Sequence, residues 1–190
     1  MLKSSLPYSW MRRTRTIGAC LALIAGLSTP VVAQSPTAKA EDALKAGFLY
    51  NFAKFTEWPE MDDLDFSIQF CVEENTLDPS VFEGWGRKQV KKRPVRVTLF
   101  DEYDSKNLKS CDIVFIRNTD ENLSELLELA EENGILTVSD SEGFGKRGGH
   151  IELYLADRKL RFKVNLESLD AARLSLGAGV LRLAEIVTSS

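Results

Sequence analysis

The chain has 190 residues, of which 44% are hydrophobic, and its 24 basic and 28 acidic side chains give a formal net charge of −4. This length accommodates one domain with a single sizeable hydrophobic core. The acidic balance argues against nucleic acid as a partner, because proteins that bind it carry a basic surface.

The first 33 residues have the three parts of a secretory signal peptide. Four basic side chains open the chain, an apolar run extends from Ile17 to Leu27, and Val31 and Ala33 have the small-residue spacing of a cleavage site. The apolar run is too short to remain in a bilayer as a spanning helix. We therefore expect a signal peptide over residues 1–33 and export to the periplasm of a Gram-negative cell.

Processing at this site leaves a linker at residues 34–40 and a folded domain at residues 41–190, with 20 basic and 28 acidic side chains and a net charge of −8. A lipoprotein cleavage box ending at Cys20 is an alternative, although it lies at the start of the apolar run rather than after it. A second alternative is translation from Met11 instead of Met1, because the basic opening is long.

The folded domain is predicted to begin with an aromatic-rich helix that ends at Trp58, before Pro59. Its apolar side chains at i, i+4, i+8 and i+11 share one helix face. The face expected to enter the core consists of Leu44, Phe48, Phe52 and Phe55. Five aromatic side chains within eleven residues exceed what one buried face needs. Part of this helix is therefore expected to contact a second subunit in a homodimer.

Four segments after this helix have strand patterns. Residues 93–100 alternate apolar and polar side chains, as a half-buried strand does. Residues 111–116 and 135–139 are continuous apolar runs, which are typical of strands buried on both faces. The fourth segment, residues 66–72, is bounded by acidic residues.

Two helices are predicted between these strands. A short one over residues 80–89 is interrupted near its two glycines. The longer one follows Asn122, which we expect to be its N-cap with Glu125 as the capping partner, and it ends before Gly134.

The C-terminal part predicts a hairpin and a long helix. Residues 150–156 and 160–166 both alternate apolar and polar side chains around a short turn, as paired strands do. Residues 167–187 have helical apolar spacing. The apolar stripe of this helix consists of Leu169, Ala172, Leu176, Val180, Leu183 and Val187.

This order of elements predicts an α/β fold. Alternating strands and helices form parallel sheets, and a hairpin adds antiparallel strands. We therefore expect a single domain with a mixed β-sheet, made of parallel strands plus a C-terminal hairpin, and flanked by helices on both faces.

Two cysteines, Cys71 and Cys111, remain after removal of the leader. An even pair in an oxidising compartment is typical of a disulfide. Cys71 falls late in one predicted strand and Cys111 at the start of another, so parallel neighbours in strict register would hold them at opposite ends. We expect the bond, provided that the strands are offset.

Gly143, Gly145 and Gly148 have the G-x-G-x-x-G spacing of a dinucleotide-binding loop. That loop requires a helix directly after it, because the pyrophosphate binds at the helix N-terminus. Here the next segment is a predicted strand. The glycines are therefore expected to form a tight connection between strands, where they permit positive φ.

Several motifs along the chain resemble the YfiR family of exported bacterial proteins. They are "KAGFLYNFAKFTEWP", "CDIVFI", "LTVSDSEGFGKRGGHIELYL", "RFKVN" and "VLRLAEIV", in the order and spacing of that family. The resemblance covers nearly the whole mature chain and implies a periplasmic regulator. It also implies a partner, because the name-giving member restrains a YfiN-type inner-membrane diguanylate cyclase by binding its periplasmic portion.

The sequence departs from the family pattern in two places. The best-known members carry a second cysteine pair around the glycine turn, and residues 139–152 contain no cysteine. Redox sensing through such a pair is therefore in doubt. The last predicted helix has Leu176, Gly177 and Ala178 where the family often has Ile-Ser-Ser, so small side chains remain but the hydroxyls do not.

The predicted hairpin supplies the candidate partner-binding residues. One face carries apolar side chains that should enter the core. The other face should display an aromatic side chain and paired charges beside the last helix, which suits specific protein recognition. The candidate set is Glu152, Tyr154, Arg161 and Lys163.

The remaining motifs favour no catalytic or metal site. His150 is the only histidine and is expected to be structural, because no second histidine accompanies it to build a zinc site. The acidic clusters at residues 60–65 and 100–104 do not have the pattern of a calcium-binding loop with its central glycine. We expect both to be solvated loops. We expect neither a cofactor nor an enzyme activity.

Two alternatives concern binding. Residues 87–96 hold six basic side chains and no acidic one, which indicates either a solvated sheet edge or a surface for an anionic partner. The leading function is a regulator that restrains a membrane signalling protein. The alternative is a periplasmic small-molecule binding module that reports to a histidine kinase or a transporter.

Overall fold

The computed structural model describes residues 36–58, 67–101, 105–117 and 122–190. The predicted signal peptide, residues 34 and 35 of the predicted linker and the acidic segment at 60–65 lie outside the described residues, whereas residues 36–40 of that linker belong to the first helix. Residues 34–190 belong to one compact unit. Among the described residues, no helix is both long and apolar enough to cross a membrane.

An eight-stranded sheet forms the centre of the domain, in the order β10-β8-β7-β6-β5-β2-β4-β3. The strands β4, β2, β5, β6 and β7 run parallel, β8 is antiparallel to β7, and β3 is antiparallel to β4. The strands are β2 (Ile68–Glu73), β3 (Gln89–Val90), β4 (Arg93–Phe100), β5 (Ile113–Ile116), β6 (Leu136–Ser139), β7 (Ile151–Ala156), β8 (Lys159–Asn165) and β10 (Glu185–Val187). The predicted mixed sheet with a C-terminal hairpin is therefore confirmed.

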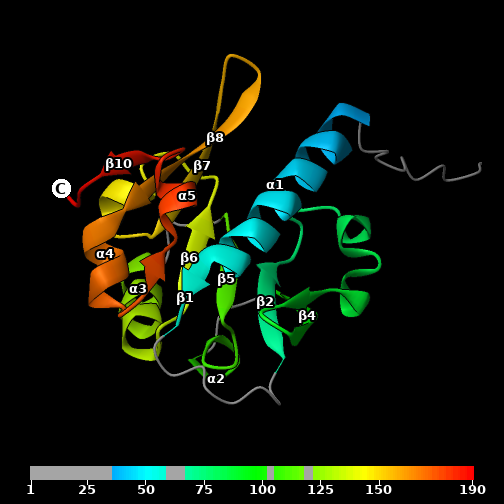
Figure 1. Cartoon of the computed structure of the whole chain (residues 1–190), viewed down its shortest axis with the longest axis horizontal. Coiled ribbons are helices and arrows are strands. Elements are labelled where there is room, and N and C mark those ends of the chain that lie inside the picture. The colour runs from blue at the N-terminus through cyan, green and yellow to red at the C-terminus, as the bar shows by residue number, and fades with distance from the viewer. Residues whose placement is uncertain (1–35, 59–66, 102–104, 118–121) are drawn as a thin grey trace, which may run out of the picture. The chain divides into compact units, whose positions relative to one another are not determined.

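Helices cover both faces of this sheet. Helix α1 (Pro36–Phe55) lies across one face (Figure 1), and its buried side chains join the larger apolar cluster with those of the strands. Helices α2 (Ser105–Leu108) and α3 (Leu123–Asn133) contribute to a second apolar cluster. Alternate residues of β5 divide between the two clusters, as expected for a strand buried on both faces.

The connections contain short elements. Two 3₁₀ turns, η1 (Pro79–Phe82) and η2 (Trp85–Arg87), stand where a single interrupted helix was predicted. A third turn, η3 (Gly145–Arg147), joins β6 to β7. Strand β1 (Thr56–Glu57) follows α1 directly and pairs with β9 (Ser175–Leu176) in a separate two-stranded sheet.

The prediction of one long C-terminal helix over residues 167–187 is wrong. The chain instead forms α4 (Leu166–Ala171), β9, α5 (Ala178–Leu181) and β10. The helix ends because Arg173 adopts a left-handed conformation (φ 57°), and Gly177 and Gly179, which are poor helix formers, follow it. Most of the predicted stripe is still buried or half-buried, but Leu183 is 77% exposed.

The buried face of α1 also differs from the predicted one. Leu44 and Phe55 are exposed, at 57% and 44%, whereas Ala46 and Ala53 are buried. The buried face of α1 consists of these two alanines together with Leu49 and Phe52, all of which belong to the larger apolar cluster. Phe52 is buried as predicted and packs edge-on against Phe162 of β8, with ring centroids 5.1 Å apart.

The capping prediction for α3 is half right. Gly134 ends the helix in a left-handed conformation (φ 63°), as expected. Asn122 makes no side-chain capping bond, because its backbone is also left-handed (φ 59°) whereas an N-cap ordinarily requires an extended backbone.

The predicted disulfide joins Cys71 to Cys111, with Cα atoms 5.8 Å apart. The geometric objection disappears because β2 begins at Ile68, later than predicted, so Cys71 lies in mid-strand. Cys111 lies two residues before β5, where Asp112 N–H donates to Gln69 O (3.0 Å). The bond therefore fastens the centre of β2 to the entry of β5.

Candidate functional site

The hairpin formed by β7 and β8 brings the four predicted partner-binding residues together. The loop residues Asp157 and Arg158 both have positive φ (52° and 59°), as a two-residue hairpin turn requires. The resulting register pairs Glu152 with Lys163 and Tyr154 with Arg161. The four side chains therefore form two cross-strand pairs on one face of the hairpin.

Glu152 is not displayed on this face, contrary to the prediction. It is 1% exposed, and its carboxylate accepts hydrogen bonds from Gly145 N–H (3.0 Å) and Lys163 Nζ (2.8 Å). Gly145, in the glycine turn η3, covers it, and a Cβ atom on Gly145 would lie 3.0 Å from the side chain of Val187 in β10. Glu152 therefore connects the hairpin to the glycine turn and is not available for a partner.

The outer part of the same face is accessible and remains polar. Tyr154 donates its hydroxyl hydrogen to Glu185 of β10 (3.0 Å), and Lys163 Nζ lies 4.9 Å from the centre of the Tyr154 ring. The hydrogen bond with Glu152 raises the pKa of Lys163. Arg161 is exposed, 3.8 Å from the Asp157 carboxylate. An ordered aromatic ring among charges of both signs is an arrangement suited to protein recognition.

Buried polar residues support the base of the hairpin. The Nδ1 atom of His150 accepts a hydrogen bond from Thr137 N–H (3.0 Å), and the Thr137 hydroxyl accepts one from His150 N–H (3.0 Å). Burial lowers the pKa of His150 to about 4, so the imidazole is neutral. Asn165 donates to Gly145 O (2.8 Å) and caps α4 by accepting from Ser168 N–H (3.1 Å). These contacts give His150 and Asn165 structural roles.

The glycine run forms the turn between β6 and β7. Gly143 and Gly148 have positive φ (77° and 98°), and a Cβ atom on Gly149 would lie 2.2 Å from the buried Phe144 ring. The segment after the turn is strand β7, so no helix N-terminus faces it. The glycines therefore serve chain geometry and close packing, as the sequence indicated.

An ion cluster that the sequence reasoning missed lies at the carboxyl ends of β5 and β6. Lys45 of α1 contacts Asp140 (2.7 Å) and Glu41 (2.6 Å), and Arg117 contacts Asp140 from the other side (3.0 Å). Burial alone would raise the pKa of Asp140, but its bonds with Arg117 and Lys45 outweigh burial and lower that pKa.

The position of this cluster is where open α/β sheets commonly bind ligands. Here the side chain of Lys45 enters from α1, and each of the three central charges has a protein partner. The cluster therefore fastens α1 to the sheet. The polar residues directly after two buried strands, Arg117 and Asp140, were the signal in the sequence that could have revealed it.

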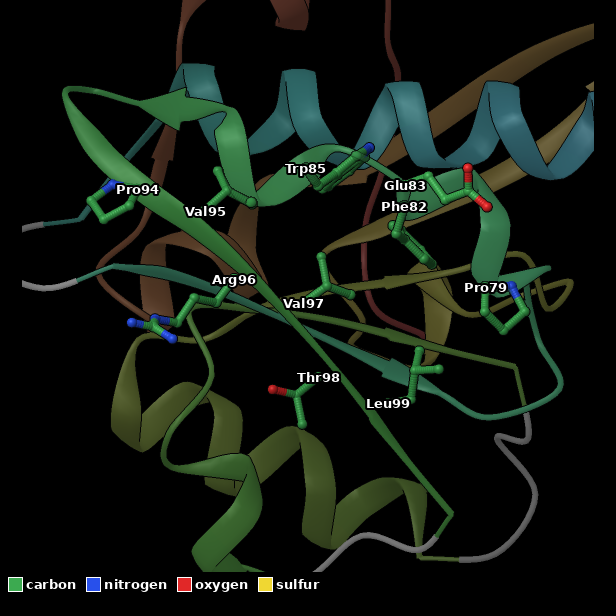
Figure 2. Close-up of a pocket in the computed structure, with 11 residues that line it drawn as sticks. Pro79, Phe82, Glu83, Trp85, Pro94, Val95, Arg96, Val97, Thr98 and Leu99 are labelled. Carbon is green, nitrogen blue, oxygen red and sulfur yellow. The ribbon is translucent and has the colours of Figure 1, made fainter.

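A groove along β4 is a further surface feature, lined by Pro79, Phe82, Glu83, Trp85, Gly86 and residues 94–99 (Figure 2). Its volume is about 660 Å³. Among the described residues, no group of three or more His, Cys, Asp or Glu side chains could hold a metal ion.

These features define a single-domain α/β protein with a disulfide-fastened mixed sheet, a glycine turn and a C-terminal hairpin. The chain belongs to the YfiR/HmsC-like family, whose sequence profile matches residues 42–185. This is a family of periplasmic regulators of cyclic di-GMP signalling. No curated protein sequence matches the chain.

Two solved structures are similar to this chain at low identity. A conserved domain protein from Vibrio cholerae O1 biovar El Tor is 9% identical over 76% of this chain, with a TM-score of 0.47. The ligand-free, open structure of a substrate-binding protein with adhesive properties from Clostridium difficile is 12% identical over 76% of this chain, with a TM-score of 0.48. The aligned regions cover 59% and 58% of those two chains, respectively.

Proposed function

We propose that this protein is exported to the periplasm, where it binds the extracytoplasmic part of an inner-membrane diguanylate cyclase and restrains it. The observation that carries the proposal is the family match over residues 42–185, which spans nearly the whole described domain. The leader at residues 1–33 supports export, because it has the basic, apolar and small-residue parts of a signal peptide. The function requires no catalytic step by this chain.

The accessible face of the hairpin is the surface that we assign to this partner. Tyr154 and Lys163 are half-buried, and each is held by a hydrogen bond to a carboxylate on another strand. Arg161 is exposed beside them. A preformed surface loses little conformational entropy when a partner binds. Glu152 has a positioning role here, because its buried carboxylate accepts a hydrogen bond from Lys163 Nζ (2.8 Å) and so orients the Lys163 side chain.

The double substitution Tyr154→Ala with Arg161→Ala tests this surface. Removing an aromatic anchor and a charge from the centre of an interface should weaken partner binding by about thirtyfold or more. Binding is measured by chemical cross-linking to native membranes, followed by mass spectrometry of the captured proteins. Circular dichroism checks that the variant is folded.

Leu155→Ala is the matched control, because Leu155 lies in the same hairpin, is 55% exposed and alternates to the opposite face. This variant should bind as the unmodified protein does. A folded double variant with undiminished capture of the cyclase would remove the hairpin face from the proposal.

A further inference from the structure

The outer edge of strand β4 is only partly covered. β3 pairs with β4 at Arg93 and Pro94, and Val95 N–H donates to Lys88 O (3.1 Å) just beyond that pairing. Within the described parts of the chain, no strand pairs with this edge after Val95. Residues 96–100 therefore form an open edge about 16 Å long, at about 3.3 Å per residue.

The alternation of the backbone shows which groups of this edge face outward. N–H and C=O of one residue point to the same side of a strand, and successive residues alternate. The backbone N–H of Val95 points outward and donates to Lys88 O. The backbone C=O of Phe100 points inward, toward β2, and accepts from Glu74 N–H (2.8 Å). Val97 and Leu99 therefore present their N–H and C=O groups outward, which gives the edge four hydrogen-bonding groups.

The groove of about 660 Å³ follows this edge. Figure 2 shows Phe82 and Pro79 on its far side, with Val97 and Leu99 pointing toward them from β4. Leu99 is 37% exposed, while Trp85 at the inner end is buried. An added strand could therefore place alternate apolar side chains against Phe82 and Leu99 while its backbone pairs with β4.

Exposed basic side chains near the groove outnumber Glu83, the one acidic residue of its lining, in a domain that is acidic overall. Arg96 is exposed on the opposite face of β4, and the adjoining turn and hairpin carry exposed Arg87, Lys88 and Lys92. Residues 97–100, in contrast, read Val-Thr-Leu-Phe, without a charge, proline or glycine to discourage pairing. The basic residues thus lie beside the open edge, and no charged side chain at residues 97–100 opposes pairing of its backbone N–H and C=O groups with another strand.

We propose that the β4 edge binds an extended, acidic segment of a partner protein as an added strand. Apolar side chains of that segment would fill the groove, and its acidic side chains would face Arg96 and the neighbouring basic residues. This surface is separate from the hairpin face, because β4 and β8 lie toward opposite ends of the sheet order. The inference therefore does not depend on the hairpin assignment.

A peptide probe tests strand addition directly. The probe is an acetylated and amidated Glu-Val-Glu-Val-Glu peptide, titrated into isotope-labelled protein purified from the periplasm of an expression host. The amide resonances of Val97 and Leu99 should shift and become protected from hydrogen exchange as the probe binds. A probe methylated at every backbone nitrogen cannot donate backbone hydrogen bonds, and a Lys-Val-Lys-Val-Lys probe reverses its charge. Both should bind roughly tenfold or more weakly.

Leu99→Pro is the decisive variant. It removes an outward N–H but no hydrogen bond to β2, and edge strands accept proline in that orientation. The variant should remain folded and bind the first probe about tenfold more weakly, whereas Leu99→Val, which keeps the N–H, should bind it normally.

Three results of the binding experiments would overturn the proposal. They are an absence of shifts at Val97 and Leu99 at millimolar probe, equal binding of the N-methylated probe, and unchanged binding by Leu99→Pro. A dimer that Leu99→Pro converts to monomer would assign the edge to a second copy of this chain and would also overturn it.

Discussion

At the scale of single residues, His150 makes the stability of the domain depend on pH. Its imidazole is buried and its pKa is lowered to about 4 from 6.5, chiefly by burial. Between these values the unfolded chain binds a proton that the folded chain does not. The stabilisation is therefore complete above pH 6.5 and is lost as the pH falls toward 4, by up to about 3 kcal/mol.

Urea unfolding at pH values above 6.5 and close to 4 measures this effect. His150→Asn is the control, because its amide oxygen can take the place of Nδ1 as the acceptor for Thr137 N–H (3.0 Å in the native contact) but does not titrate. The variant should lose less stability than the unmodified protein over the same interval. Equal losses in the two proteins would show that another group controls the response.

Glu152 shows what alternation in a sequence can and cannot predict. The pattern of residues 150–156 correctly placed Glu152 and Tyr154 on the face opposite Ile151. Alternation carries no information about what covers a face. Gly145, which belongs to a different part of the chain, donates its N–H to Glu152 (3.0 Å), so a charge expected at the surface is buried.

At the scale of secondary-structure elements, the Cys71–Cys111 bond fastens β2 to β5. It closes a separation of 40 residues, for which the chain-entropy account gives about 4 kcal/mol of stabilisation. The double substitution Cys71→Ser with Cys111→Ser should lower the melting temperature clearly without abolishing folding, because the remaining core is large. Thermal unfolding followed by circular dichroism measures the change.

A chemical control accompanies this prediction. Reducing agent should lower the melting temperature of the unmodified protein toward that of the double variant and leave the variant unaffected. If the unmodified protein and the double variant melted at the same temperature under oxidising conditions, the bond would have no part in stability.

Strands were more predictable from the sequence than the C-terminal helix. The hairpin was predicted because residues 157–159 separate two alternating runs, and the strand at residues 111–116 was predicted because that segment is a continuous apolar run. The apolar spacing of residues 167–187 also fits a helix. Its interruption depends on the backbone of Arg173 (φ 57°) and on the pairing of Leu176 with Thr56, which are tertiary features.

At the scale of the whole molecule, the sheet order separates two surfaces. The hairpin face lies toward one end, beside β10, and the open edge of β4 lies toward the other, beside β3. The sequence identified the residues of the hairpin and the basic stretch at 87–96. It did not identify the groove, because that depends on how η1 and η2 fold beside β4.

The central claim is that the protein restrains a diguanylate cyclase, and the cellular concentration of cyclic di-GMP tests it most directly. Deleting the gene in the native host should raise that concentration. Restoring the unmodified gene should reverse the rise, whereas the Tyr154→Ala, Arg161→Ala double variant should not. An unchanged concentration after deletion, under conditions in which the cyclase is produced, would contradict the account.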